Sequence, residues 1–198
     1  MKIYDISQEI FSCEVYPGDP APKKETLASI NKRDVCNLTA FYMCAHNGTH
    51  IDAPYHFFAD GKTVDMLPLE KTVGEAYVVG HKGDIGAEDA ERMLKKADGI
   101  SRILIKGDVT VTAEAAKVFA EAEIDLLGNE SQTVGPKDAP MEVHKILLSK
   151  DIVLLEGIRL GDVPEGVYTL CAQPIDLGGC DGAPVRAILI GDKYCSEK

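Results

Sequence analysis

The sequence predicts an α/β domain built on a mixed β-sheet. Short apolar segments typical of buried strands alternate along the chain with amphipathic segments of helical period. Because the alternation does not follow a strict β-α-β repeat, a mixed sheet is expected, with two sheets as an alternative. No linker or shift in composition divides the 198 residues, so we expect one domain over 1–198.

The N-terminal part combines strand patterns with loops. Alternating apolar residues predict a strand over 2–6, and the proline- and glycine-rich stretch 16–22 is turn or loop. Residues 38–44 carry strand-forming side chains and lead directly into a histidine-rich segment. We therefore expect that segment to begin at the end of a strand.

The rest of the chain alternates between strands and helices. Residues with strand character occupy 76–80, 103–105, 124–128, 152–155, 167–171 and 185–190. Three helices are expected between them, each with its apolar residues on one face: one carrying Ala90, Met93, Leu94 and Ala97; one from Thr112 carrying Ala115, Phe119 and Ala122; and one from Pro140 carrying Val143, Ile146 and Leu147.

Composition excludes several classes of partner. The formal net charge of −11 and the pI near 4.9 repel phosphate backbones and anionic lipid, so we expect no nucleic acid and no membrane partner. The longest apolar runs are far shorter than the ~20 residues of a membrane-spanning helix. The N-terminus carries no export signal, and the cytoplasm is therefore the expected location.

One segment concentrates chemistry. Three of the five histidines, His46, His50 and His56, fall within eleven residues together with Asp52. Imidazole and carboxylate are ligands of zinc and similar ions in catalytic sites. In an extended strand His46 and His50 would lie about 13 Å apart, too far to share an ion. The segment must therefore bend between them.

The residues inside the segment permit that bend. Gly48 supplies the backbone freedom, Thr49 offers a hydroxyl to hold the bend, and Pro54 interrupts any strand pairing after Asp52. His50 and Asp52, two residues apart, should then face the same side. A single histidine is usually an ordinary surface or core residue, but three with an aspartate and a flexible glycine favour metal binding.

Two distant residues are weaker candidates by themselves. His144 lies in the expected third helix beside Val143 and Ile146, where a histidine at the edge of the core is an ordinary finding. Glu156 ends the apolar run 152–155, and a buried carboxylate is costly unless it is paired or bound to a cation. It could equally turn toward solvent.

The motif resembles that of a known family. His46-x-Gly48-Thr49-His50-x-Asp52-x-Pro54-x-His56 is similar to the H-x-G-T-H-x-D-x-P-x-H signature of the cyclase family of metal-dependent hydrolases, which includes bacterial kynurenine formamidase and isatin hydrolase. All seven fixed positions match. The resemblance extends to the early stretch 16–19, to His144 with the stretch 154–157, and to the closing stretch 182–186.

The resemblance implies roles that spacing alone does not. His46, His50, Asp52, His144 and Glu156 would bind metal, as one ion or as two bridged by Asp52 and Glu156. His56 would remain unligated and act as the acid/base. The family also implies a swivelling β/β/α fold and a homo-oligomer, either a dimer or a tetramer. Zinc is the first expectation for the ion, with manganese as the alternative.

The expected reaction is metal-assisted hydrolysis of a small-molecule substrate. A divalent ion activates water and polarises a carbonyl, and a nearby histidine can protonate the leaving atom. We expect cleavage of a C–N bond in a small amide, as in an arylformamidase acting on N-formyl-kynurenine. The segment after Ile124-Asp, reading Leu-Leu-Gly-Asn-Glu-Ser, departs from a common family pattern near the expected substrate groups.

Two alternatives stay open. The same ions could serve a lactam, lactone or ester hydrolase, or a cyclase, and pocket shape would decide among these. The ions could instead be structural, in a binding protein without turnover. Structural zinc sites usually close with four Cys or His ligands, whereas a carboxylate-rich set beside a free histidine leaves room for water. The composition of the set therefore favours catalysis.

Overall fold

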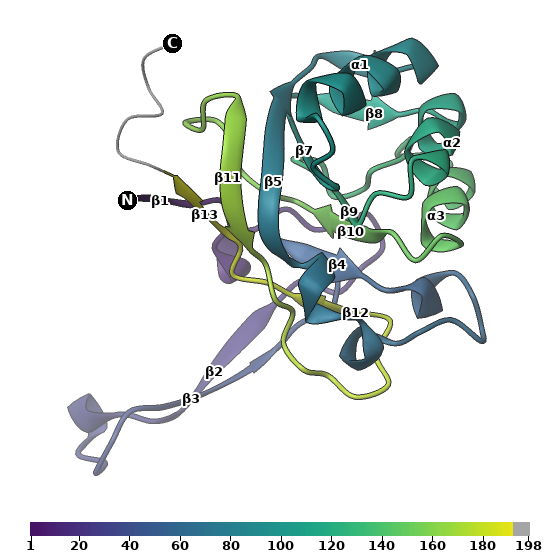
Figure 1. Ribbon diagram of the computed structural model, residues 1–198. Helices are drawn as coiled ribbons and strands as arrows, with labels where there is room; N and C mark the ends of the chain where they lie inside the picture. The colour runs from purple at the N-terminus through teal and green to yellow at the C-terminus, as the bar shows by residue number, and fades with distance from the viewer. Residues whose placement is uncertain (192–198) are drawn as a thin grey trace.

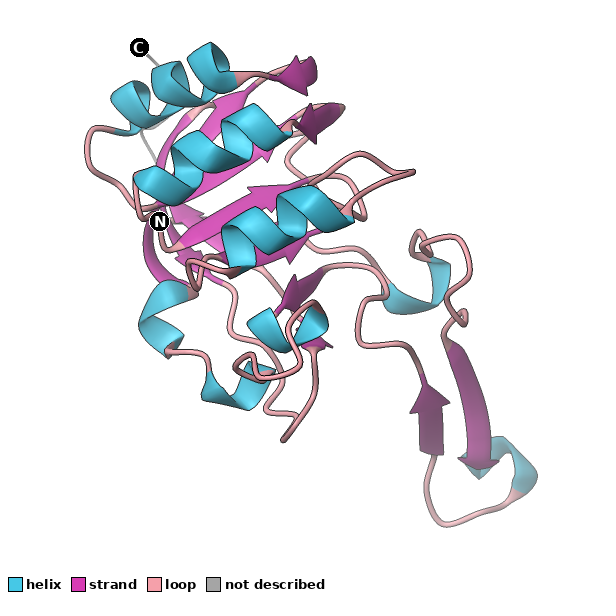
Figure 2. Cartoon of the chain, turned by 90° about the vertical axis from the view of Figure 1, so that its right-hand side faces the viewer, coloured by secondary structure: helices cyan, strands magenta, loops and turns pink. Residues whose placement is uncertain are grey.

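The protein, described here as a computed structural model over residues 1–191, has a long mixed sheet with three helices on one face (Figures 1 and 2). The expected α/β class with a mixed sheet is confirmed. The sheet has nine strands in the order β1-β13-β11-β5-β7-β9-β10-β4-β12. Its central strands β5, β7, β9 and β10 run parallel, and the flanking pairs are antiparallel.

The strands of the large sheet are β1 (Lys2–Asp5), β4 (His50–Asp52), β5 (Val73–Gly80), β7 (Arg102–Lys106), β9 (Leu126–Asn129), β10 (Val153–Glu156), β11 (Gly166–Cys171), β12 (Gly182–Pro184) and β13 (Ile188–Gly191). Two separate ribbons pair β2 (Lys23–Ala28) with β3 (Leu38–Tyr42), and β6 (Gly83–Ile85) with β8 (Val109–Val111). The helices are α1 (Ala87–Ala97), α2 (Ala113–Glu121) and α3 (Met141–Leu148).

Short 3-10 helices occupy Ile10–Ser12, Ile30–Lys32, Pro54–His56, Val64–Met66 and Leu69–Lys71. Among residues 1–191, the longest helix has 11 residues, and none could cross a membrane.

Each helix returns the chain to the next parallel strand. Helix α1 lies in the connection from β5 to β7, α2 in the connection from β7 to β9, and α3 in the connection from β9 to β10. All three pack on the same face of the sheet (Figure 2). All three helices lie where helices were expected, and the Thr112 side chain accepts a hydrogen bond from the Ala115 amide at the start of α2. Ala122, expected on the buried face of this helix, lies past its end and is exposed.

The parallel strands bury both of their faces. Ile103 and Ile105 of β7 point to the helices, while Leu104 between them points to the opposite core. The same alternation in β10 places Leu154 with the helices and Leu155 in the opposite core. Apolar burial on both sides explains why these strands have continuous apolar sequences.

One ribbon departs from the compact body. Strands β2 and β3 form an arm that projects away from the sheet (Figures 1 and 2). The expected strand over 38–44 thus exists as β3, but it belongs to this arm and ends at Tyr42, before the histidine-rich segment. Large apolar side chains on the arm are exposed: Leu27, Ile30, Val35, Leu38, Phe41 and Tyr42.

Candidate metal centre

The histidine-rich segment bends as expected before it enters the sheet. Gly48 has φ +67°, in the left-handed region that favours glycine. The Thr49 hydroxyl donates to the Gly157 carbonyl at 2.8 Å and accepts from the Gln8 amide at 2.9 Å. These bonds fix the bend, so His46 returns toward the residues of β4.

Strand pairing aligns three of the expected ligands. His50 and Asp52 lie on the same face of β4, and Glu156 of β10 is directly opposite His50 in the antiparallel register. The His50 Nε2 atom lies 3.4 Å from Asp52 Oδ1 and 3.4 Å from Glu156 Oε2. All three side chains are buried, so the carboxylates lie inside the protein rather than turning to solvent.

Helix α3 supplies the fourth ligand candidate. His144 directs Nε2 toward Glu156 Oε1 at 3.1 Å and toward Asp52 Oδ2 at 3.4 Å. Its Nδ1 faces the Pro140 carbonyl at 2.8 Å, and Nδ1 of His50 faces the Gly48 carbonyl at 3.0 Å. A backbone carbonyl therefore holds the Nδ1 proton of each ring, which leaves Nε2 available to a metal.

The other two histidines predicted for the site, His46 and His56, lie side by side at the edge of this group. His46 and His56 have ring centroids 4.1 Å apart, and His46 Nδ1 lies 2.8 Å from Asp52 Oδ1. His56 sits in the 3-10 helix after Pro54 and is about 29% exposed at its side chain. The structure thus brings all six predicted site residues together, and two triads could hold an ion: His46, Asp52 and His56, or His50, Asp52 and Glu156.

The carboxylates set the charge of the histidines. Burial opposes a charge on His46, but hydrogen bonds to Asp181 and Asp52 outweigh it and raise its pKa to about 11. Burial is likewise outweighed at His144 and His50, where bonds to Asp52 and Glu156 raise the pKa to about 10 and about 9. Burial would raise the pKa of Asp52, but the surrounding histidines hold it well below its usual range.

Sequence patterns did not indicate Asp181. Its Oδ2 lies 2.8 Å from His46 Nε2 and 3.1 Å from His56 Nδ1. It lies just before β12, which pairs with β4 and brings residue 181 beside residues 46–56. The only sequence hint is its position directly before the closing stretch 182–186.

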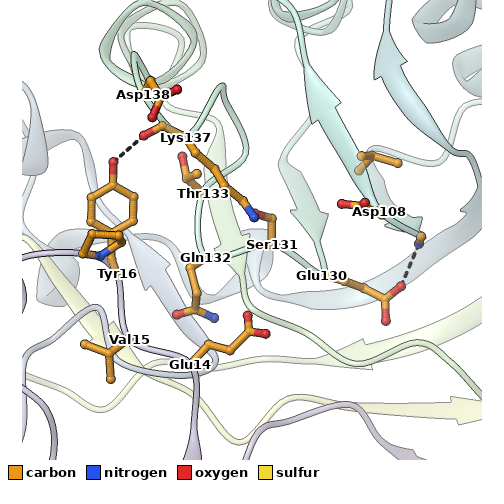
Figure 3. A pocket seen from close by; sticks show the side chains of 13 residues that line it. Glu14, Val15, Tyr16, Asp108, Glu130, Ser131, Gln132, Thr133, Lys137 and Asp138 are labelled. Carbon is orange, nitrogen blue, oxygen red and sulfur yellow. Dashed lines mark hydrogen bonds between the residues drawn. The ribbon is translucent and has the colours of Figure 1, made fainter.

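The donors surround a small cavity of about 200 Å³ that adjoins a larger one. The larger hollow, about 750 Å³, is lined in part by Tyr16, Gln132 and Thr133 (Figure 3). These three residues also line the small cavity. The Tyr16 hydroxyl closes one side by donating to the Lys137 carbonyl at 2.8 Å (Figure 3). Phe57 contributes an apolar wall to the small cavity, where it contacts His56 and His144.

Unpartnered polar groups mark the junction of the two cavities. Both amide atoms of Gln132 and the hydroxyl of Thr133 are buried without a hydrogen-bond partner in the described chain. The Gln132 amide lies against Gly157, the residue after Glu156, and a side chain at 157 would collide with it. Buried polar groups normally have partners, so this junction is suited to a polar part of a ligand.

Comparison with known proteins gives consistent similarities. The family model described as "Putative cyclase" matches residues 4–136. Kynurenine formamidase of Salinibacter ruber is 35% identical over 206 residues, which cover 96% of this chain and 97% of that protein. Kynurenine formamidase of Bacillus anthracis is 32% identical over 204 residues, which cover 95% and 97%.

Solved structures share the fold. One, described as "The Structure Of Potential Metal-Dependent Hydrolase With Cyclase Activity", is 29% identical with a TM-score of 0.81 and covers 95% of this chain and 96% of its own. Isatin hydrolase A from Labrenzia aggregata has a TM-score of 0.82 at 20% identity, with 96% and 94% covered.

Proposed function

Since the chain belongs to the cyclase family, we propose that it is a metal-dependent hydrolase that cleaves the C–N bond of a small amide, with N-formyl-kynurenine as the model substrate. The observation that carries the proposal is the pair of buried carboxylates, Asp52 and Glu156, surrounded by histidines and facing a cavity. The full-length similarity to kynurenine formamidases supports the substrate class.

The donor set fits a divalent cation. Two carboxylates buried side by side repel each other, and no lysine or arginine of the described chain pairs with either one. A cation held by His46, His50, Asp52, His144 and Glu156 would neutralise them, whether as one ion or two. Such a cation supplies Lewis acidity toward a substrate carbonyl and makes water a better nucleophile at neutral pH.

The acid/base role falls to His56. Its Nδ1 is engaged by Asp181, so Nε2 is the nitrogen that can exchange a proton at the cavity. Its partial exposure lets substrate reach the ring, in contrast to the buried His50. In this proposal Nε2 takes up the proton that the attacking water loses and then delivers it to the leaving nitrogen as the C–N bond breaks.

Three finer properties belong to the same proposal. Zinc is the proposed ion because imidazole and carboxylate donors suit it, with manganese as the alternative. A homo-oligomer is supported by the exposed apolar side chains on the β2–β3 arm, which a second copy could cover. We also place the protein in the cytoplasm. Elemental analysis, light scattering and cell fractionation measure these three properties.

The deciding experiment combines metal content with turnover. Purified protein is analysed for metal and assayed on N-formyl-kynurenine, isatin and phenyl acetate, with and without a chelator. Chelator-sensitive release of formate supports the proposal. Preferential turnover of isatin or of the ester would instead identify the protein as a lactam hydrolase or an ester hydrolase. Bound metal without any turnover would favour the non-catalytic binding protein, and absence of metal after reconstitution would refute the metal centre.

A further inference from the structure

Asp181 joins two histidines with different proposed tasks. A single oxygen, Oδ2, lies within hydrogen-bond distance of Nε2 of His46 and of Nδ1 of His56. The backbone of the same residue is also fixed, because its carbonyl accepts from the Ala53 amide at 2.9 Å, one residue past β4. The backbone of Asp181 is thus held beside the end of the strand that carries His50 and Asp52.

The residue after Asp181 is adapted to the same contact. A Cβ on Gly182 would lie 2.7 Å from Cε1 of His46 and 2.6 Å from the Ile51 carbonyl. Any other residue at 182 would therefore displace the His46 ring. The two rings lie 4.1 Å apart at an interplanar angle of 35°, so Asp181 and Gly182 together hold them as a packed pair.

The hydrogen bonds also determine which nitrogen each ring presents. A carboxylate oxygen only accepts, so His46 donates to Asp181 from Nε2 and His56 donates to it from Nδ1. Nδ1 of His46 faces the Asp52 carboxylate, so it also carries a proton in the metal-free chain, and an ion bound there would displace that proton while Asp181 keeps the one on Nε2. Nε2 of His56 is left for the cavity. A carboxylate behind a metal-binding histidine commonly fixes the tautomer and orientation of the ring.

We propose that Asp181 is a positioning residue that sets the tautomer and orientation of both the metal ligand His46 and the acid/base His56. This inference rests on the proposed function. One carboxylate would place ligand and proton carrier in a common frame, so that His56 is aligned with the substrate only when His46 is also in place. Asp181 itself would touch neither substrate nor ion.

The test uses the full-length, zinc-loaded protein with Asp181→Ala and Asp181→Asn, and with Asp176→Ala as the matched control. Asp176 is exposed in the same connection between β11 and β12. For Asp181→Ala we expect kcat to fall about 10- to 100-fold, KM to change less than twofold, and zinc affinity to fall about tenfold. Asp181→Asn, which keeps an acceptor oxygen, should lie between the wild type and Asp181→Ala.

A spectroscopic readout separates positioning from a general structural role. Long-range ¹H–¹⁵N correlation of the histidine rings, with His56 assigned by comparison with His56→Gln, should show the Nδ1-H tautomer of neutral His56 in the wild type. Asp181→Ala should shift it to the Nε2-H tautomer, and Asp176→Ala should leave it unchanged.

Contrary results are equally clear. An unchanged tautomer and unchanged zinc affinity in Asp181→Ala would overturn the inference. If that variant fails to fold, Asp181→Asn decides. Wild-type values of kcat, tautomer and zinc affinity in Asp181→Asn would show that the carboxylate does not position the two histidines, and would overturn the inference. If wild-type protein binds zinc but hydrolyses none of the test substrates, the proposed function fails, while the tautomer and affinity still decide the role of Asp181.

Discussion

The small cavity and the larger hollow beside it are built on opposite principles. Around the small cavity, the charged and imidazole groups contact one another at 2.8–3.4 Å. At the junction with the hollow, the Gln132 amide and the Thr133 hydroxyl have no partner among the described residues. Under the proposed function, this difference means that the protein fixes the geometry of the reacting groups, whereas the polar groups at the junction are left for the rest of a ligand to satisfy.

The largest expected effect concerns the small cavity. Asp52→Asn removes the carboxylate that contacts His46, His50 and His144, so zinc content should drop to background and turnover should disappear. Elemental analysis and the formamide assay measure both losses. Asp60→Asn, an exposed change in the loop after His56, should leave both unchanged. Full zinc content in Asp52→Asn would remove Asp52 from the ligand set.

A second large effect separates metal binding from proton transfer. His56→Ala should retain zinc and lose about 10²–10⁴-fold in kcat, the usual contribution of a positioned acid/base. His81→Ala, outside both cavities, is the matched control. Loss of zinc in His56→Ala would instead make His56 a ligand, in agreement with the alternative triad of His46, Asp52 and His56.

The charge state of the histidines around the small cavity predicts a strong pH dependence of metal binding. The pKa values of His46, His144 and His50 are raised to about 11, about 10 and about 9, so all three are protonated in the metal-free chain at pH 7. A metal must displace these protons, and zinc affinity should rise at least about tenfold per pH unit from 6.5 to 8.0. Competition with a zinc indicator measures this, and a flat profile would contradict the ion pairs.

The same shifts predict the stability of the metal-free protein. A histidine whose pKa is raised on folding stabilises the fold below its ordinary value of 6.5, and this contribution is lost as the pH rises through the folded value. The metal-free protein should therefore melt at a lower temperature at pH 9.5 than at pH 7.5. Scanning calorimetry of chelated protein at the two pH values checks the sign, and a higher melting temperature at pH 9.5 would contradict it.

The smallest expected effect concerns the junction with the larger hollow. Gln132→Met keeps the shape of the side chain but removes the unpartnered amide, so KM should change about three- to tenfold with kcat nearly constant. Steady-state kinetics on two formamides with different distal groups measures the change, and Gln173→Met, at an exposed position, is the control. A loss of kcat equal to that of His56→Ala would show that the two cavities are not functionally separate.

Much of the fold was predictable because its main strands and helices are long enough to show a period. The apolar runs of β7 and β10 and the amphipathic α1 could be recognised from local residues alone, and the fold class and family resemblance are confirmed. The three-residue strands β4, β6, β8 and β12 are too short for any pattern. The arm was not foreseen, because its exposed apolar residues resemble those of a buried strand.

The candidate site shows the same limit. The bend at Gly48 and the shared face of His50 and Asp52 follow from local chemistry, and the structure has both. Asp181 could not be anticipated, since it lies 125 residues after His56 and is brought there only by the pairing of β12 with β4. The ligand roles of His46, His50, Asp52, His144 and Glu156 stay predictions until a metal is measured.

The position of β4 between β10 and β12 has a consequence for how the protein is made. The strand that carries His50 and Asp52 has no hydrogen-bonded neighbour in the sheet until residues 153–156 and 182–184 arrive. During synthesis, residues 50–52 must wait for residues 153–156, about a hundred residues later, before His50 and Asp52 meet Glu156. The geometry proposed to bind the ion is therefore a late event in biosynthesis, because it forms only after residues 153–156 have been made and can pair with β4.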